Sequence, residues 1–224
     1  MNRRIELHIH TIYSDGTLTP YEVIYRYLRL RCRALAFTDH ADMTNLDFII
    51  ERYKKLEMLE EEVDIPIIKG VELTYIPPTI IPRAVRRARE LGFELIVIHG
   101  ESPVEPVPDG TNHMAVSAKG VDILAHPGFI TVEDAEIAAS NGVHLEITSR
   151  NGHSLTNGYI ASICRKVGAK TVVNTDAHGP DDLIDYEDAL KIALGAGLTQ
   201  REAERAVNDY MWEIVEKILE ERKR

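Results

Sequence analysis

The sequence predicts an α/β fold in which helices pack outside a parallel sheet. Short apolar runs alternate with longer segments whose apolar residues recur at helical spacing along the 224 residues. Alternation of this kind is typical of repeated βα units, because a parallel strand needs a long crossover connection before the next strand. The chain is 44% hydrophobic and long enough for one sizeable core, so we expect a single α/β barrel domain over residues 1–224.

Seven segments have the composition of buried strands: Arg4–His10, Ala34–Thr38, Ile67–Leu73, Glu94–His99, Asp122–His126, Val143–Thr148 and Thr171–Asp176. Residues two apart project to the same face of a strand, so His8 and His10 in the first segment should point together. Ile5, Leu7 and Ile9 are expected to project to the opposite face. Two imidazoles at the end of a strand can bind one metal ion, although an isolated pair is as typical of a surface edge strand.

Six segments between these strands have apolar residues at helical spacing: Pro20–Arg31, Leu46–Glu62, Pro82–Leu91, Val132–Ser140, Leu155–Val167 and Asp181–Leu194. Capping residues support these assignments. Thr19 precedes Pro20, and a hydroxyl before a proline at the first helical position is typical of a helix N-terminus. Thr199 stands three residues before Glu202, which is the spacing of a capping box. Residues from about 199 to 222 are therefore expected to form a closing amphipathic helix with a solvated charged face.

The charge balance limits the classes of partner. Asp and Glu number 36 against 26 Lys and Arg, which gives a formal net charge of -10. Binding to nucleic acid depends on a basic surface, so we do not expect a nucleic-acid partner. A small anionic substrate remains compatible with this charge, because divalent ions bound in a pocket can attract phosphate.

Cysteine usage and hydropathy indicate a cytoplasmic protein. Cys32 and Cys164 are far apart and lack C-x-x-C spacing, so neither a disulfide scaffold nor a thiolate zinc site is predicted. The sequence has no run of about 18 uncharged apolar residues and no apolar signal segment near its start. We therefore expect a reducing compartment and no membrane partner, while the oligomeric state stays open.

Ligand-type side chains stand at the C-terminal ends of the predicted strands. Six are histidines and three are carboxylates: His8, His10, Asp15, His40, Glu72, His99, His126, Asp176 and His178. The loops after the strands form the active-site face of parallel α/β barrels, so these side chains should converge there. Imidazole nitrogen and carboxylate oxygen suit zinc, manganese or iron. Nine such groups are too many for one ion, so we expect two or three divalent ions with Glu72 as a bridging carboxylate.

Five motifs follow one another in the order of a known family: H-x-H-T-x-x-S-D-G from His8, T-D-H ending at His40, G-V-E ending at Glu72, A-H-P-G around His126, and T-D-A-H ending at His178. This ordered set resembles the PHP family, the polymerase and histidinol phosphatase metal-dependent phosphoesterases. The matching motifs span residues 4–178. The resemblance implies a distorted (βα)7 barrel, similar to a TIM barrel, with a trinuclear metal site.

The resemblance also implies which residues share an ion. The first ion would be held by His8, His10, Glu72 and Asp176, and the second would share Glu72 with His99 and His126. The third would be held by Asp15, His40 and His178. Asp15 stands where some members of the family carry histidine, and a turn-forming role is the alternative for this residue.

Three further residues are candidates for substrate chemistry. Arg150 follows the sixth predicted strand, and its guanidinium could bind phosphate oxygens through a bidentate fork, with His153 as a weaker partner. Glu101, two residues after His99, could protonate the leaving alkoxide or bind a substrate amine. A surface ion pair is the alternative for Arg150, and a plain loop charge is the alternative for Glu101.

Other residues near the strand ends are expected to support the site. Asp39 either orients a ligand histidine or is a buried structural carboxylate. Glu146 is expected to line the pocket, where it could also bind a substrate amine. Glu105, Pro106, Pro108 and Asp109 are expected to make a stiff, polar loop suited to covering the site, and Gly110–Met114 is also expected to be a loop.

The sequence therefore favours a phosphomonoesterase that hydrolyses a small phosphorylated metabolite. A hydroxide bridging two ions would attack phosphorus, and Glu72 would space the ions. By resemblance, histidinol phosphate is the favoured substrate. A nucleotide phosphatase or single-strand exonuclease with the same ions is one alternative, although the acidic balance and the 6% aromatic content disfavour it. A non-catalytic metal-binding or regulatory module is another alternative.

Overall fold

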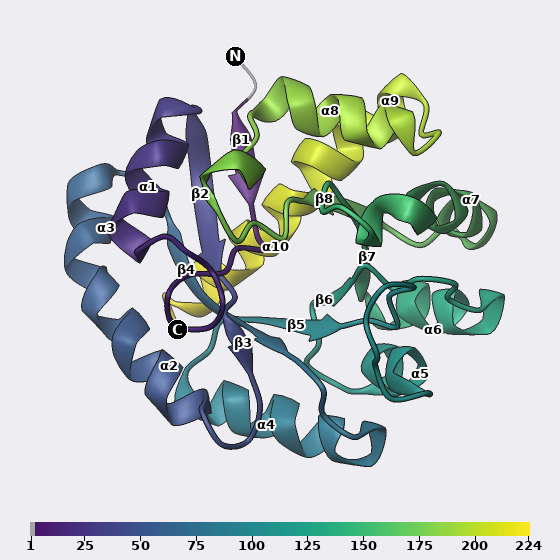
Figure 1. The fold of residues 1–224 in the computed structure, drawn as a ribbon, viewed down its shortest axis with the longest axis horizontal. Coiled ribbons are helices and arrows are strands. Elements are labelled where there is room, and N and C mark those ends of the chain that lie inside the picture. Colours follow the sequence, from purple (N-terminus) through teal and green to yellow (C-terminus); the bar gives the residue numbers. More distant parts are fainter. Residues whose placement is uncertain (1–2) are drawn as a thin grey trace.

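The computed structural model describes residues 3–224 and shows a curved sheet surrounded by helices (Figure 1). The strands are β1 (Arg4–Glu6), β2 (Cys32–Phe37), β3 (His40–Ala41), β4 (Ile67–Leu73), β5 (Leu95–His99), β6 (Ile123–Ala125), β7 (His144–Thr148) and β8 (Thr171–Asn174). The described ladders are parallel, with the strand order β1-β2-β4-β5-β6-β7-β8 and β3 paired with β4. An isolated parallel bridge joins Ile9 to Ala177, so that the sheet nearly closes into a barrel. The predicted (βα)7 barrel is confirmed.

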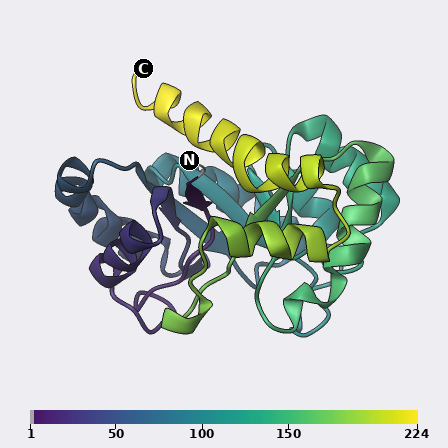
Figure 2. The same cartoon turned by 90° about the horizontal axis from the view of Figure 1, so that it is seen from above.

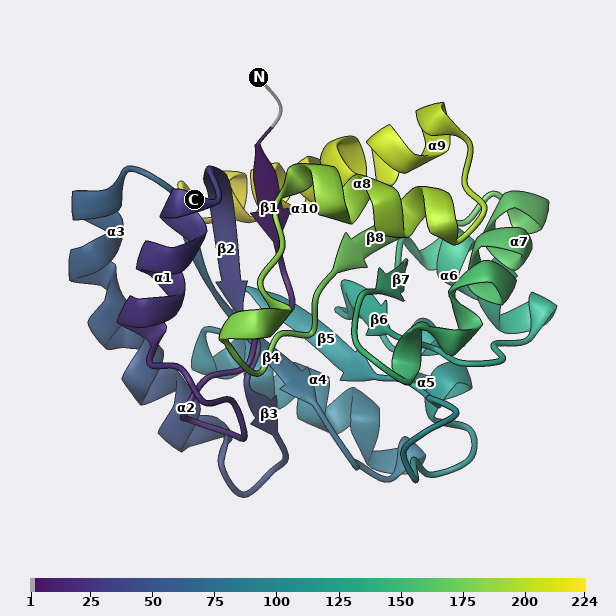
Figure 3. The same cartoon turned by 45° about the horizontal axis from the view of Figure 1, so that its top comes forward.

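Helices α1 to α8 lie around the outside of the sheet, as Figures 1 and 3 show from two directions. The helices are α1 (Pro20–Arg29), α2 (Leu46–Tyr53), α3 (Glu57–Val63), α4 (Ile81–Leu91), α5 (Thr111–Ser117), α6 (Val132–Asn141), α7 (Asn157–Val167), α8 (Tyr186–Gly195), α9 (Gln200–Glu204) and α10 (Tyr210–Glu221). A 3₁₀ turn at Lys54–Leu56 separates α2 from α3, and a π-helical segment at Arg205–Asp209 joins α9 to α10. Within residues 3–224, no helix combines the length and the apolar character that a bilayer crossing requires.

Two apolar clusters cover the two faces of the sheet. Phe37 of β2 belongs to a large cluster that includes Tyr27 of α1 and buried residues of the other outer helices. Its neighbour Ala36 belongs to a second cluster with Met211 and Ile214 of α10. Successive residues of a strand project to opposite faces, which separates the two clusters. Figure 2 shows α10 lying along the side of the molecule that the outer helices leave uncovered.

The first strand is shorter than predicted, because β1 ends at Glu6 and the chain then leaves the regular ladder. Beyond this point the backbone N–H of Leu7 donates to the side chain of Asn174 at the end of β8 instead of to a backbone carbonyl. Ile5 and Leu7 pack in the cluster with α10, whereas Ile9 packs with the outer helices. The prediction that these three residues share one face was therefore wrong for Ile9.

Two short elements were not predicted, and one helix begins later than expected. The two-residue strand β3 is too short to show alternation, and α5 lies in the stretch that was expected to be a loop. Ala115 and Val116 are buried in α5, and two adjacent apolar residues do not reveal helical spacing. The helix predicted from Asp181 begins at Tyr186, where the side chain of Asp185 accepts a hydrogen bond and caps it.

A buried ion pair in β1 ties together the two ends of the sheet. Arg4 and Glu6 are fully buried, and Arg4 Nη2 lies 2.5 Å from Glu6 Oε2. The hydroxyl of Tyr27 also donates to Glu6 Oε2, over 3.1 Å. The other oxygen, Glu6 Oε1, accepts the backbone N–H groups of His8 at 3.3 Å and Thr175 at 3.1 Å. Glu6 therefore fixes both segments that carry the first and last predicted metal ligands.

Replacement of Glu6 should destabilise the fold strongly. Glu6→Ala leaves the Arg4 guanidinium buried without its partner, a loss that typically costs about 3–5 kcal/mol of unfolding free energy. Tyr27→Phe removes one hydrogen bond to the same carboxylate and should cost about 1 kcal/mol. Tyr25→Phe, on the exposed side of α1, is the matched control and should leave stability unchanged. Urea unfolding measures the series, and a cost below about 1 kcal/mol for Glu6→Ala would contradict this role.

Candidate metal centre

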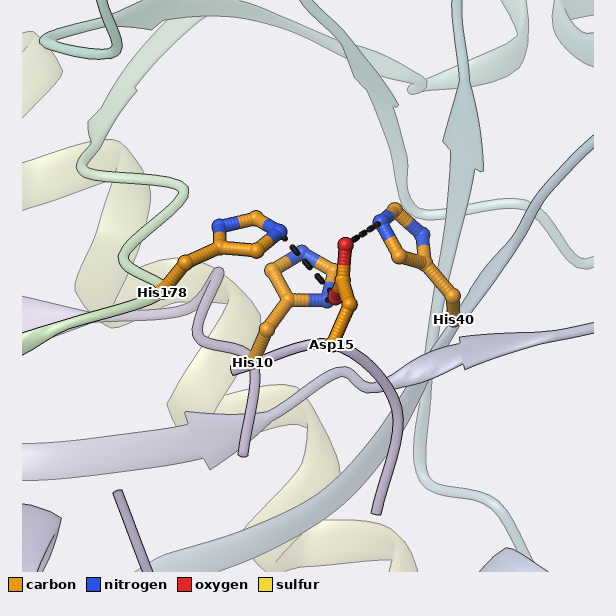
Figure 4. Close-up of side chains that lie close together, drawn as sticks. All are labelled: His10, Asp15, His40 and His178. Atoms are coloured by element: carbon orange, nitrogen blue, oxygen red, sulfur yellow. Dashed lines mark ion pairs between the residues drawn. The ribbon is translucent and has the colours of Figure 1, made fainter. Parts of the chain in front are cut away.

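The nine predicted metal ligands converge at the C-terminal end of the sheet. They form four overlapping groups, in each of which the potential ligand atoms lie within 4.8 Å of one another. The groups are His10, Asp15, His40 and His178; His8, His10 and Glu72; His8, His126 and Asp176; and Glu72, His99 and His126. Figure 4 shows the first group, in which the Asp15 carboxylate reaches both His178, at 3.2 Å, and His40, at 3.6 Å.

Backbone geometry at the strand ends brings these side chains together. His40 of β3 is paired with Glu72 of β4 in their parallel ladder, and His99 is the last residue of β5. His126 and Asp176 follow β6 and β8 with positive φ angles of 26° and 53°. A left-handed backbone at a non-glycine residue costs of order 1–3 kcal/mol and is concentrated at functional sites. The surrounding structure therefore holds His126 and Asp176 in orientations that the local sequence alone disfavours.

Buried polar atoms in this centre lack hydrogen-bond partners. Among the described residues these atoms are His8 Nε2, both ring nitrogens of His10 and His126, both carboxylate oxygens of Glu72, and Asp176 Oδ1. A buried polar atom without a partner typically costs about 1–3 kcal/mol. Cations shared among these nitrogens and oxygens would satisfy them, so the residues present fit a metal centre.

The separations of these atoms match those of neighbouring ligands on one ion. Bonds of about 2.1 Å place two ligand atoms about 3.0 Å apart at octahedral angles and about 3.4 Å apart at tetrahedral angles. Glu72 Oε1 lies 3.4 Å from His8 Nε2 and 3.5 Å from His126 Nε2. Asp176 Oδ1 lies 3.0 Å from His10 Nε2. Glu72 faces histidines of two ligand groups, which is the arrangement of a bridging carboxylate.

Glu146 supports two of the ligands from behind. It is fully buried, and its Oε1 accepts a hydrogen bond from His8 Nδ1 over 2.8 Å. Its Oε2 accepts the backbone N–H of His126 over 3.1 Å. A proton on Nδ1 leaves His8 Nε2 with a lone pair toward the centre, as metal-bound histidines require. The expectation that Glu146 lines the pocket was wrong, because the strand turns this side chain behind His8.

Asp39 holds the loop that follows His10 in place, instead of orienting the ring of a predicted ligand histidine. Its carboxylate accepts hydrogen bonds from the backbone N–H of Thr11 at 2.6 Å, the hydroxyl of Thr11 at 2.7 Å and the hydroxyl of Ser14 at 2.6 Å. The hydroxyl of Tyr53 donates to it as well. Of the two interpretations considered for Asp39, the buried structural carboxylate is the correct one.

The buried groups shift one another's pKa values. Burial lowers the pKa of His40, but the carboxylates of Glu72, Asp15 and Asp176 together outweigh burial and raise this pKa to about 9. Burial and the neighbouring His40 hold the pKa of His10 well below its ordinary value. Burial opposes ionisation of Glu72, yet the His8 and His40 rings hold its pKa well below the ordinary range. Glu72 therefore stays ionised and favours cations around it.

A cavity of about 300 Å³ opens onto the centre. It is lined by five of the ligand residues and also by Glu105, Arg150 and His153. Arg150 Nε lies 3.7 Å from Asp176 Oδ2, and Arg150 Nη1 lies 3.7 Å from Asp182 Oδ2. The fold therefore brings both predicted substrate-binding residues next to the predicted metal ligands.

Glu101 does not line this cavity. Its carboxylate accepts the backbone N–H of Asn112 over 3.0 Å, and the Asn112 side chain accepts the Glu101 N–H over 3.0 Å, so Glu101 holds the start of α5. The loop then carries Glu105 into the cavity, where its Oε2 lies 2.9 Å from His99 Nε2 and its Oε1 lies 3.2 Å from His153 Nε2. The structure thus corrects the predicted place of Glu101. The stiffness of the loop was the one sequence signal that pointed toward Glu105.

The family comparison agrees with this arrangement. The family model described as the PHP domain matches residues 6–186, which include the nine predicted ligand residues. The chain belongs to the PHP family. An uncharacterized protein of Methanocaldococcus jannaschii, MJ1295, is 49% identical over 217 residues, which cover 96% of this chain and 100% of that protein. A protein of Thermoanaerobacter sp. named as a probable phosphatase is 27% identical over 220 residues, covering 88% of this chain and 87% of the relative.

Solved structures share the PHP-type barrel. A chain of archaeal ribonuclease P, determined by cryo-EM with mature tRNA, has a TM-score of 0.71 at 17% identity and covers 98% of this chain and 91% of its own. Histidinol phosphate phosphatase of Lactococcus lactis subsp. lactis, crystallised with zinc, L-histidinol and phosphate, has a TM-score of 0.63 at 15% identity. That match covers 88% of this chain and 94% of the phosphatase. At these identities the two structures establish likeness of fold.

Glu72→Gln should lower the occupancy of two ions together in the PHP centre. The amide keeps the size of the side chain but loses the charge that two ligand groups share. Elemental analysis after metal loading measures the content, and we expect two or three ions per unmodified chain. Glu187→Gln, at an exposed position in α8, is the control and should keep the full content. Loss of one ion alone would contradict the shared ligand, and an unmodified chain with no more than one ion would contradict a trinuclear centre.

Proposed function

We propose that this PHP chain is a metal-dependent phosphoesterase that hydrolyses small phosphomonoesters. The observation that carries the proposal is the cavity in which the Arg150 guanidinium lies beside the metal-ligand groups. Guanidinium groups and divalent ions are the two kinds of partner that bind phosphoryl oxygens most readily. Membership of the PHP family and the relatives named as probable phosphatases support the same class of reaction.

Arg150 is suited to bind the phosphoryl group. Its side chain is 29% exposed, and its carboxylate contacts with Asp176 and Asp182 are both 3.7 Å long. Charge-assisted hydrogen bonds of arginine are shorter, about 2.7–2.9 Å. Among the described residues the guanidinium therefore has no close bidentate partner, and its fork can turn toward a phosphate. The substrate role predicted for His153 stays a prediction.

The chemistry would be divided between the ions and the chain. Bound divalent ions would act as Lewis acids on the phosphoryl oxygens and would activate water for attack. Glu72 would keep two ligand groups at a fixed spacing, and Glu146 would keep His8 Nε2 turned toward the centre. Arg150 would bind and orient the phosphoryl group from the cavity side.

The size and charge of the cavity favour a small monoester over nucleic acid. A volume of about 300 Å³ lies at the lower end of small-molecule sites. Asp42 and Glu105 line the cavity beside the ligand residues. A polyanion would meet these carboxylates and a chain of net charge -10, whereas a monoester places a single phosphate next to the ions.

The same carboxylates would attract a substrate whose organic part is positively charged. Glu101 and Glu146 were considered from the sequence as partners for a substrate amine, but they bind α5 and His8 instead. Asp42 and Glu105 face the cavity and could bind the substrate amine. Histidinol phosphate carries such an amine, and it is the specific substrate that we propose.

One observation favours a nucleotide monophosphate as a second candidate. The Tyr75 side chain lines the cavity and is 54% exposed. Its ring stacks on that of His99, with centroids 5.8 Å apart and 29° between the planes. An exposed aromatic ring beside a phosphate site is suited to stacking with a base.

Arg150→Ala should lower turnover of every phosphomonoester to a similar extent. Loss of one preorganised charged donor typically costs about 10²–10³ in kcat. The metal content should stay intact, because Arg150 is not one of the ligands. Arg150→Lys should restore part of the rate, since an ammonium keeps the charge but cannot form the bidentate fork. Steady-state kinetics with parallel metal analysis measure both effects, and a normal rate for Arg150→Ala would assign phosphate binding to another group.

A substrate panel tests the proposed class. Metal-loaded protein should hydrolyse small monoesters, histidinol phosphate among them, with higher kcat/KM than nucleotides or single-stranded DNA or RNA. The advantage of a cationic substrate should weaken with salt, because its attraction to partly exposed carboxylates is screened. Higher kcat/KM for nucleotides or nucleic acid than for small monoesters would replace this proposal with the nucleotide alternative.

A further inference from the structure

The loop between β5 and α5 places one more carboxylate against the metal centre. Glu105 Oε2 lies 2.9 Å from His99 Nε2, and Glu105 Oε1 lies 3.2 Å from His153 Nε2. The Glu105 side chain is 36% exposed and lines the cavity, whereas the Glu72 side chain is fully buried. Glu105 is therefore next to a predicted ligand and within reach of a substrate.

A cation, either a proton on His99 Nε2 or a metal ion, would stabilise the contact between Glu105 and His99. The carbonyl oxygen of Gly100 can accept but not donate, so His99 Nδ1, 3.1 Å away, must be the donor. In a neutral ring the other nitrogen, Nε2, then carries a lone pair, which is the form that binds a metal ion. A carboxylate oxygen at 2.9 Å from Nε2 is stable when Nε2 carries a proton or when a metal ion lies between the two atoms, and a bound metal ion would replace that proton.

An ion bound by Glu72, His99 and His126 can be that cation. Two ligand atoms with bonds of about 2.1 Å at a right angle are about 3.0 Å apart. The separation of 2.9 Å between Glu105 Oε2 and His99 Nε2 is close to this value. It is also close to the 3.0 Å between His10 and Asp176, which are both predicted ligands.

The loop is built to hold Glu105 in this position. Prolines at 103, 106 and 108 restrict the backbone on both sides of it. Val104 packs over Gly152, where an added Cβ would lie 3.1 Å from the valine methyl groups. His153 is 3% exposed and binds the second oxygen of Glu105. His153 is thus a positioning residue for the Glu105 carboxylate.

We propose that Glu105 is an additional, displaceable ligand of the ion held by Glu72, His99 and His126, and that a phosphate group entering the cavity takes its place. The inference rests on the metal centre that the proposed function requires, and it adds a ligand from a loop outside the strand ends. Partial exposure lets phosphate reach this position. A carboxylate oxygen and a phosphate oxygen then compete for one place on the ion.

Zinc retention tests the role of Glu105 as a ligand. Glu105→Gln keeps the size of the side chain and removes its charge, while Asp109→Asn removes a carboxylate from an exposed position in the same loop and is the matched control. Zinc-loaded protein is mixed with excess chelator, and the release of each ion is followed. One ion should leave at least about tenfold faster from Glu105→Gln, with the other ions and the control unchanged. In cobalt-loaded protein, the visible absorption should change for Glu105→Gln and not for Asp109→Asn.

Binding of inorganic phosphate to the zinc-loaded protein tests displacement. Glu105→Gln should bind phosphate several-fold more tightly than the unmodified chain, because the competing carboxylate is gone. His153→Ala should act in the same direction, because it releases Glu105 from its second contact. If His153 itself bound phosphate, His153→Ala would weaken binding, which would overturn its role as a positioning residue.

The outcomes separate this inference from its alternatives. Tighter phosphate binding with unchanged zinc release would mean that Glu105 repels phosphate through space, and it would overturn the ligand assignment. Faster zinc release with unchanged phosphate binding would overturn displacement. An unmodified chain that retains no zinc would overturn the metal centre and this inference together. A chain that behaves as expected here but hydrolyses no phosphoester would overturn the proposed function and leave the Glu105 assignment in place.

Discussion

A buried carboxylate among histidine rings is the constraint on which the rest of the site depends. Both oxygens of Glu72 are shielded from water and face histidine rings, with His40 Nδ1 2.7 Å from Oε2, so the charge needs protonated rings or other cations close by. Burial opposes that charge, yet the pKa of Glu72 stays well below its ordinary range because of His8 and His40. In the absence of metal, protons on the rings balance the carboxylate, and the pKa of His40 rises to about 9 for the same reason. Bound metal ions would balance the carboxylate in place of those protons, since the ligand atoms already lie at separations typical of ligands on one ion.

Polar networks behind the ligands make this arrangement rigid. Glu6 binds the backbone beside His8 and at Thr175, and Glu146 binds the His8 ring and the backbone of His126. Each of these carboxylates is fully buried and joins segments that are far apart in the sequence. Such networks are costly when incomplete, so they favour a single arrangement of the strand ends. They also explain how strained backbone at His126 persists, because the hydrogen bond from its N–H to Glu146 is available in that conformation.

The strand ends were predictable from the sequence because each βα unit repeats the same pattern. An apolar run followed by a ligand-type residue recurs at His99 and at His126, and parallel strands bring such ends to one face. The loops were less predictable, because their paths depend on contacts that no periodicity reveals. Glu101 and Glu105 differ little in local sequence. The carboxylate of Glu101 nevertheless bonds to the Asn112 N–H at the start of α5, whereas the carboxylate of Glu105 bonds to His153 in the cavity. Short elements such as β3 and α5 contain too few apolar residues to be recognised.

The distribution of charge explains how an acidic chain can attract an anionic substrate. The centre itself contains Glu72, Asp176 and Asp15 with Glu105 beside them, while its six histidines are neutral when they bind metal. Two divalent ions would balance these four carboxylates and three would make the cavity positive, with Arg150 adding a further positive charge. Outside the cavity, salt screens the field of such a centre over about 8 Å, and the chain as a whole carries a net charge of -10. Under the proposed function, a small phosphate ester would lie entirely within the positive region, whereas a polyanion would extend beyond it along a chain of net negative charge.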